Sequence, residues 1–160
     1  LLLLLLLTSA VARAASGGSV QTDPPSTQNA SFWDQVKAVI ERHLGRPYVW
    51  GAVGLKSFDC SGFVWRVMLE DGILIKRTTA RKLYMSLPAV SKTDQFNAGN
   101  IVFFNNLKHC GIVNSRASFY HAQVSRGTNL SLLDPYWRPK VCGFRAMPKP
   151  GEVNPRWKQP

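Results

Sequence analysis

A cysteine and two histidines are the residues of this chain whose types and spacing suggest chemistry. Cys60 stands in the run Asp59-Cys60-Ser61-Gly62-Phe63, His109 follows 49 residues later, and His121 comes 12 residues after that. A thiol that attacks a carbonyl group needs a base to take its proton and a third polar group to hold that base. These side chains could therefore be the nucleophile, the base and the orienting group of one catalytic site.

The cysteine is expected in the first turn of a helix. Asp59 is a favourable N-cap, and apolar residues at helical spacing follow it from Phe63 to Met68. The unpaired N–H groups and the dipole at a helix start stabilise negative charge, which raises the thiolate fraction of a cysteine there. The alternative is a buried structural cysteine, the usual fate of a free thiol.

The two histidines can be placed by counting along a predicted hairpin. If strands 109–113 and 117–123 flank a turn at 114–116, His109 lies directly opposite His121 on the same face. One imidazole could then hydrogen-bond the other and fix its tautomer. The alternative is a pair of unrelated surface histidines. Alternation along the strand places Cys110 on the opposite, apolar face.

The helices and strands that must position these residues can be predicted from the spacing of apolar residues along the sequence. Helices are expected at 31–44, at 60–70, and from Thr78 or Thr79 to just before Pro88. Beyond Pro88 the period changes to two, and short strands are expected at 101–104, 109–113, 119–124, 130–133 and 141–145. Helices first and strands afterwards predict an α+β fold, with N-terminal helices packed on a central, mostly antiparallel β-sheet.

The two ends of the chain are predicted to lie outside this fold. Residues 1–14 are typical of a secretory signal without its start, because the leucine run is too short to span a bilayer and Ala12-x-Ala14 resembles a cleavage site. A buried leucine-rich helix is the alternative. Residues 15–30 predict a flexible linker, 31–147 the folded domain, and 148–160 a loose tail rich in Pro and Lys. We therefore expect an exported protein, periplasmic or extracellular, with no integral membrane segment once the signal is removed.

The charge balance favours an anionic partner. Twenty Lys and Arg residues against nine Asp and Glu residues give a net charge of +11, and removal of Arg13 with the signal would leave +10. Nucleic acid, anionic lipid and an acidic wall polymer are candidate partners, and solubility alone is the alternative. No aromatic-basic motif is visible, so we expect no nucleic-acid partner.

The cysteine pattern argues against a metal site. The chain has three cysteines and no CxxC or paired Cys/His spacing. An odd number in an exported protein indicates a free reactive thiol, and Cys110 and Cys142 could be bridged or free. We expect neither a metal ion nor another cofactor.

An ordered set of motifs resembles the NlpC/P60 family of papain-like cysteine peptidases. The motifs are Gly45-x-Pro47-Tyr48-x-Trp50-Gly51, Asp59-Cys60-Ser61-Gly62-Phe63, Arg77-Thr78-Thr79-Ala80, Ala98–Phe104, His109–Val113 and Tyr120-His121-Ala122. The match runs in order through residues 32–147, and the small exported murein endopeptidases of the Spr type are the most similar members. Two positions depart from the family pattern, Ala52 in place of a glycine and Cys110 in place of a valine.

The resemblance implies a papain-like fold and a thiol protease that hydrolyses peptides of bacterial cell-wall peptidoglycan. It makes Cys60 the nucleophile, His109 the base and His121 the orienting residue. It also implies a role for Tyr48 in holding the oxyanion. By the same resemblance Asp59 and Ser61 line the substrate groove.

The expected substrate is a peptidoglycan stem peptide or cross-link, cut by a monomer next to a D-centre. Arg77 and Arg81 could bind the carboxylates of such stems, because the guanidinium fork matches a carboxylate, or they could simply be solvated. Two other functions fit the scaffold. One is an antibacterial effector amidase or acyltransferase, and the other is a non-catalytic wall-binding module.

Overall fold

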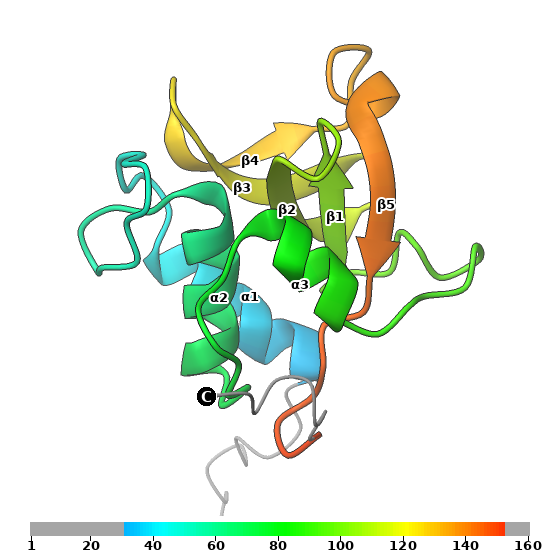
Figure 1. Ribbon diagram of the computed structural model, residues 1–160, viewed down its shortest axis with the longest axis horizontal. Coiled ribbons are helices and arrows are strands. Elements are labelled where there is room, and N and C mark those ends of the chain that lie inside the picture. The colour runs from blue at the N-terminus through cyan, green and yellow to red at the C-terminus, as the bar shows by residue number, and fades with distance from the viewer. Residues whose placement is uncertain (1–30, 153–160) are drawn as a thin grey trace, which may run out of the picture.

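The computed structural model describes residues 31–152, so the predicted signal, the linker and most of the predicted tail lie outside the described residues. The described part contains three α-helices, then five β-strands with a 3-10 helix before the last strand (Figure 1). They are α1 (Phe32–Arg42), α2 (Cys60–Glu70), α3 (Ala80–Ser86), β1 (Ile101–Phe104), β2 (His109–Ser115), β3 (Ser118–Gln123), β4 (Gly127–Leu132), η2 (Arg138–Lys140) and β5 (Val141–Arg145).

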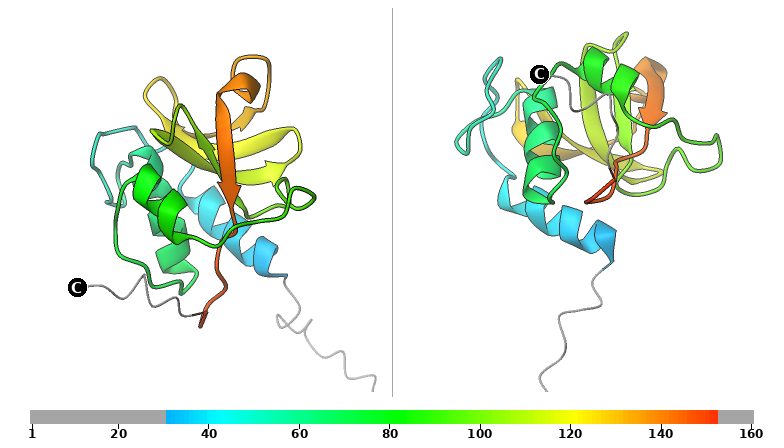
Figure 2. Two further views of the ribbon diagram at one scale, coloured as in Figure 1. Left: turned by 45° about the vertical axis from the view of Figure 1, so that its right-hand side comes forward. Right: turned by 60° about the horizontal axis from the view of Figure 1, so that its bottom comes forward.

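The strands form one antiparallel sheet in the order β4-β3-β2-β1-β5. The helices gather on one side of the sheet (Figure 2), where α2 packs on β2 and β3 while α1 and α3 pack on α2. The predicted α+β architecture is therefore confirmed. No helix within residues 31–152 is long and apolar enough to cross a membrane.

Each helix begins at the cap that its sequence supplies. Ser31 and Asp34 form a reciprocal capping box at the start of α1. Asp59 caps α2 by accepting a hydrogen bond from the backbone N–H of Gly62, and Thr79 caps α3 in the same way through Lys82. Sequence therefore fixes where α2 starts, and with it the position of the first residue in that helix, Cys60.

Apolar side chains fill both faces of the sheet. On the helix side, Ile101 and Phe103 of β1 join a core that includes Phe63 of α2. On the other side, Val102 and Phe104 join a smaller cluster with Trp137 packed against it. A strand that is buried on both faces needs a continuous apolar run, which explains the unbroken Ile-Val-Phe-Phe sequence of β1.

The hairpin of β2 and β3 forms, but the predicted register is wrong by two residues. Ile112 pairs with Tyr120 and Val113 with Phe119, with an irregularity between Val113 and Ser115. This register continues to place Gly111, not His109, opposite His121. A shorter turn than predicted, with Ser115 opposite Ser118, causes the difference. Because side chains alternate with period two, a shift of two residues still leaves His109 and His121 on one face.

The segment that leads from α1 to Tyr48 is anchored on β4. Gly45 N donates to the carbonyl oxygen of Thr128 at 2.8 Å, and Thr128 N donates to the carbonyl of Arg46 at 2.8 Å. The Thr128 hydroxyl accepts from Arg46 N at 2.8 Å and donates to the carbonyl of His43. Residues 82 positions apart in the chain are thereby held side by side.

Candidate active site

Cys60 lies at the start of α2 against the beginning of β2. Its side chain is buried, and its sulfur lies 3.9 Å from the carbonyl oxygen of Lys108. Cys110 and His109 are the neighbouring side chains that lower the pKa of this thiol most. The helix start also directs its N–H groups and the positive end of its dipole at this point.

These neighbours make Cys60 an acidic thiol. The hydrogen bond from Cys110, followed by the hydrogen bond and the charge of His109, lowers the pKa of Cys60 from 9.0 to about 5, although burial acts in the opposite direction. The pKa of Cys110 moves well above 9.0, because it gives its hydrogen bond to Cys60 and is fully buried. At neutral pH Cys60 is therefore a thiolate, and Cys110 is the neutral donor beside it.

His109 is held by His121. Nε2 of His109 and Nδ1 of His121 lie 2.8 Å apart. Burial, followed by the charge of His109, lowers the pKa of His121 from 6.5 to about 3, so this ring stays neutral at physiological pH. Trp137 stacks on His109, with ring centroids 5.3 Å apart, and meets His121 edge-on at 5.0 Å. His109 thus has His121 as a hydrogen-bonded partner and Trp137 as an aromatic neighbour.

Asp59, Ser61 and Arg77 form a polar cluster beside the thiol. Nη2 of Arg77 lies 2.8 Å from both carboxylate oxygens of Asp59, and Nη1 donates to the Ser61 hydroxyl at 3.0 Å. Asp59 also accepts from Gly62 N at 2.6 Å and from Gly51 N at 2.9 Å. Arg77 is therefore paired with Asp59 rather than simply solvated. The cluster joins the start of α2 to the loop that carries Gly51.

Gly62 allows that loop to lie directly on the helix. A Cβ at this position would come within 2.2 Å of the carbonyl oxygen of Ala52. The same carbonyl accepts a hydrogen bond from Asp59 N at 3.2 Å. Glycine at this position is thus required by close backbone approach, and the approach sets the distance between the Tyr48 loop and Cys60.

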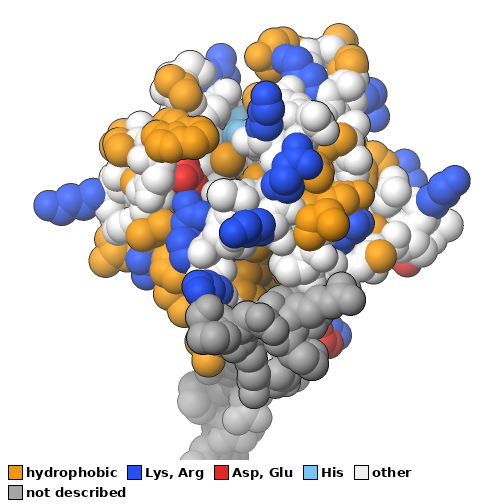
Figure 3. All heavy atoms as spheres, in the orientation of Figure 1, with side chains coloured by type: hydrophobic (Ala, Val, Ile, Leu, Met, Phe, Trp, Pro, Cys, Tyr) orange, Lys and Arg blue, Asp and Glu red, His pale blue; other side chains and the backbone are white. Residues whose placement is uncertain are grey.

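Two neighbouring hollows that share Tyr48 and Lys108, together called the groove, lie beside Cys60 and His109. One, of about 610 Å³, is lined by Cys60 together with Asp59, Ser61, Arg77, Arg81 and the exposed Trp50. The other, of about 380 Å³, is lined by His109 and Trp137. Basic side chains are spread over this face of the molecule and acidic ones are few (Figure 3).

Tyr48 is half-buried, and burial raises its pKa, with the nearby Cys60 and Asp59 charges adding to the effect. Its phenol therefore stays protonated and can donate a hydrogen bond. Arg81 is exposed and donates to the carbonyl of Asn106 at 3.1 Å. All the residues singled out in the sequence thus line this groove or support it, with His121 standing behind His109.

Sequence reasoning missed two neighbours of the site. Cys110 was expected only in the apolar core, and it is buried there, but its thiol also meets Cys60. Its position directly after His109 is a signal, because alternation turns it toward the helix face where Cys60 begins α2. Trp137 lies in the aperiodic segment before η2, and no spacing rule could have assigned it to the histidines.

The three cysteines form no disulfide within residues 31–152. Cys60, Cys110 and Cys142 are all free thiols, with Cys110 buried and Cys142 exposed. Within residues 31–152 no group of three or more His, Cys, Asp or Glu side chains could hold a metal ion.

Comparison with known proteins identifies relatives of this arrangement. The chain is 30% identical over 135 residues to the probable endopeptidase NlpC of Escherichia coli (strain K12), an alignment that covers 77% of this chain and 86% of that protein. It is 33% identical over 106 residues to the probable peptidoglycan endopeptidase LytE of Bacillus subtilis (strain 168), covering 64% of this chain. The chain spans only 30% of the length of LytE.

Structural comparison agrees. A solved protein of Staphylococcus aureus, described as similar to a lipoprotein of the NLP/P60 family, superposes with a TM-score of 0.63 at 27% identity, over 72% of this chain and 41% of that one. Residues 45–146, well over half of the chain, match the NlpC/P60 family as a whole. The predicted resemblance is confirmed, and the chain belongs to the NlpC/P60 family.

Proposed function

We propose that this protein is an exported cysteine endopeptidase that hydrolyses peptide bonds in peptidoglycan stem peptides or their cross-links. One observation carries the proposal. An acidic thiol at a helix start has the His109 imidazole among the neighbours that lower its pKa, and a second, neutral imidazole lies 2.8 Å from the first. Cys60, His109 and His121 then have the roles of nucleophile, general acid–base and orienting residue.

The reaction begins from a Cys60 thiolate and a protonated His109. The thiolate attacks the scissile carbonyl carbon and forms a C–S bond, while the carbonyl oxygen takes the negative charge. N–H groups at the start of α2 and the protonated phenol of Tyr48 are suited to hold that oxyanion. Since these donors are fixed by the helix and the Tyr48 loop, they need no rearrangement when the charge develops.

His109 then protonates the leaving amine as the C–N bond breaks, which gives a thioester on Cys60. Water next attacks the thioester carbonyl. His109 takes a proton from this water, the C–S bond breaks, and the thiolate is restored with release of a carboxylic acid. His121 keeps the His109 ring in place through both half-reactions.

The substrate class is supported by the relatives and by the charge of the groove. Relatives at 30% and 33% identity are named as a probable endopeptidase and a probable peptidoglycan endopeptidase. Peptidoglycan stems carry free carboxylates, and the exposed Arg81 and Lys108 line the hollow beside Cys60. We propose cleavage next to a D-centre of the diaminopimelate-containing stem or cross-link, outside the cytoplasm, by a monomer.

Digestion of purified muropeptides, followed by mass spectrometry, tests the proposal. The protein should release peptide fragments and leave the sugars intact, whereas Cys60→Ala should release none. Circular dichroism would show that the variant keeps its fold. A digest that releases only sugars would contradict a peptidase, and casein cut as readily as muropeptides would contradict the D-centre preference.

A further inference from the structure

The hydrogen bonds that hold the base continue beyond His121 into β4. Nε2 of His121 lies 2.8 Å from the hydroxyl oxygen of Ser131. That hydroxyl donates to Oδ1 of Asn129 at 2.9 Å, and Nδ2 of Asn129 donates to the carbonyl of Gly127 at 2.8 Å. The side chains meet because His121 of β3 pairs directly with Asn129 of β4, so residues 121, 129 and 131 share one face of the sheet.

In this series of hydrogen bonds, the donor and the acceptor of each bond are fixed by the one before it. The carbonyl of Gly127 can only accept, so it turns the NH₂ group of Asn129 toward itself and the amide oxygen toward Ser131. Gln123 also donates to that oxygen, at 3.1 Å. The Ser131 hydroxyl must then give its proton to Asn129, which leaves its lone pairs for an N–H donor from His121.

The assignment of donors and acceptors extends from His121 through His109 to the thiol of Cys60. A neutral His121 that donates from Nε2 has its lone pair on Nδ1 and can only accept there. His109 must therefore donate from Nε2, which leaves its Nδ1 as the atom that exchanges a proton with Cys60. Once His109 has given its proton to the leaving amine, a reversed set of hydrogen bonds would leave the lone pair of His109 on Nε2, the nitrogen that faces His121.

We propose that Ser131 and Asn129 are positioning residues that fix the tautomer of His121 and, through it, the nitrogen with which His109 acts as base. This inference rests on the proposed roles of Cys60 and His109. Ser131 touches no reacting atom. It acts through His121, as an outer partner acts on a catalytic imidazole.

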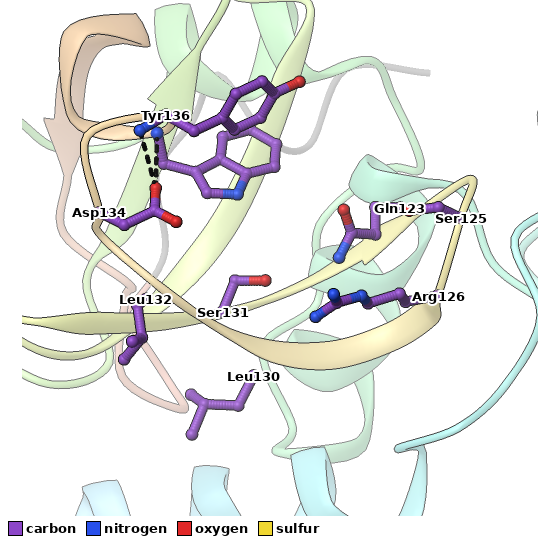
Figure 4. Close-up of a pocket in the computed structure, with 9 residues that line it drawn as sticks. Gln123, Ser125, Arg126, Leu130, Ser131, Leu132, Asp134 and Tyr136 are labelled. Atoms are coloured by element: carbon purple, nitrogen blue, oxygen red, sulfur yellow. Dashed lines mark hydrogen bonds between the residues drawn. The ribbon is translucent and has the colours of Figure 1, made fainter.

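The position of Ser131 separates this role from a structural one. β4 is an edge strand of the sheet, and Ser131 opens on a hollow of about 440 Å³ that Gln123 of the neighbouring strand also lines (Figure 4). Water from this hollow can replace a lost hydroxyl for folding purposes. It cannot replace the fixed direction of the hydrogen bond, because water has two protons and can donate to His121 as well as to Asn129, whereas the single hydroxyl proton of Ser131 goes to Asn129.

The experiment compares Ser131→Ala with Ser131→Thr, which keeps the hydroxyl on a strand-favouring residue. Ser118→Ala is the matched control, since it removes another serine hydroxyl of the same sheet, one that accepts from Asn114 at 2.8 Å. We expect Ser131→Ala to lower kcat for muropeptide cleavage about 10- to 100-fold with KM unchanged. Ser131→Thr should recover most of this loss, and Ser118→Ala should keep the wild-type rate.

Nitrogen-15 NMR of the imidazoles supplies a readout that needs no substrate. The wild type should show His121 protonated on Nε2 alone, and Ser131→Ala should show a mixture of tautomers. Wild-type kcat together with an unchanged tautomer in Ser131→Ala would overturn the inference and leave the proposed function standing. A tautomer shift in a protein that cleaves no muropeptide would overturn the proposed function instead, while the link from Ser131 to His121 stands.

Discussion

Two thiols in contact hold opposite protonation states at the start of α2. Cys60 has a pKa of about 5, whereas the pKa of Cys110 lies well above 9.0. Cys110 is the largest cause that lowers the pKa of Cys60, and His109 adds to it. A helix start also favours the thiolate of Cys60.

The pH dependence of alkylation should report this arrangement. Because the thiolate is the reacting form, inactivation by iodoacetamide should proceed at a constant rate above pH 6 and fall about tenfold per pH unit once the pH drops below the pKa of about 5. Replacing the donor in Cys110→Val should raise that midpoint. Alkylation that halves near pH 8 in the wild type would contradict an acidic Cys60.

The two arginines of the groove should respond differently to removal. Arg77→Ala leaves the largely buried Asp59 carboxylate without its cation, so we expect the free energy of unfolding to fall by about 2 kcal/mol. Arg81→Ala should change that free energy by less than about 0.5 kcal/mol and raise KM for muropeptides, since Arg81 is exposed. Urea denaturation and steady-state kinetics of both variants test this, and an unchanged KM in Arg81→Ala would remove it from the substrate site.

At the scale of the elements, the contact between α2 and the Tyr48 loop sets the site. Gly62→Ala places a methyl group 2.2 Å from the Ala52 carbonyl, so we expect a loss of about 1–3 kcal/mol of stability and a lower kcat. Gly54→Ala, in the segment between Tyr48 and α2, is the control, because the nearest atom to its added Cβ would be 3.9 Å away. The melting temperatures of the two variants show whether stability is lost through the contact with the Ala52 carbonyl or through any replacement of glycine by alanine. Equal melting temperatures would show that the loop can move away freely.

The elements could largely be predicted because each depends on local signals. The cap at Asp59 fixes the start of α2, and the apolar run of β1 fixes its bounds at 101–104. The hairpin register could not be predicted, because it depends on the length of the turn, which here leaves Ser115 opposite Ser118. The sheet face on which each histidine lies was still predicted correctly. The register differs by two residues, and an even difference leaves every side chain on the same face of the sheet.

The groups around the base escaped prediction for a related reason. Ser131 and Asn129 can be assigned to His121 only once the pairing of β3 with β4 is known. Trp137 stacks on His109 from a segment with no period. Sequence spacing thus identifies residues that carry the reaction, whereas tertiary pairing identifies those that hold them.

At the scale of the whole molecule, the net charge of +11 should govern attachment to the wall. Peptidoglycan and its associated polymers are anionic, and exposed charges act only within the Debye length. Binding to purified sacculi should therefore be strong at about 0.01 M salt and weak at about 1 M, where the Debye length is about 3 Å. Sedimentation of the inactive Cys60→Ala variant with sacculi measures this without digestion. Sacculus binding that does not change with salt concentration would contradict attachment through the net positive charge.

The anchoring of residues 43–46 on Thr128 has a consequence for the order of folding. A nascent chain makes α1, the Tyr48 loop and Cys60 early, but Thr128, which holds the loop in place, is made 82 residues after Arg46. Contacts of such long sequence separation form late, because loop closure must be paid for before they give any stability. Cys60 is thus synthesised long before the strand that completes its surroundings, and a partly made chain carries this thiol with no assembled groove. Under the proposed function, peptide cleavage would therefore begin only after the strand that carries Thr128 has been made and has paired with residues 43–46.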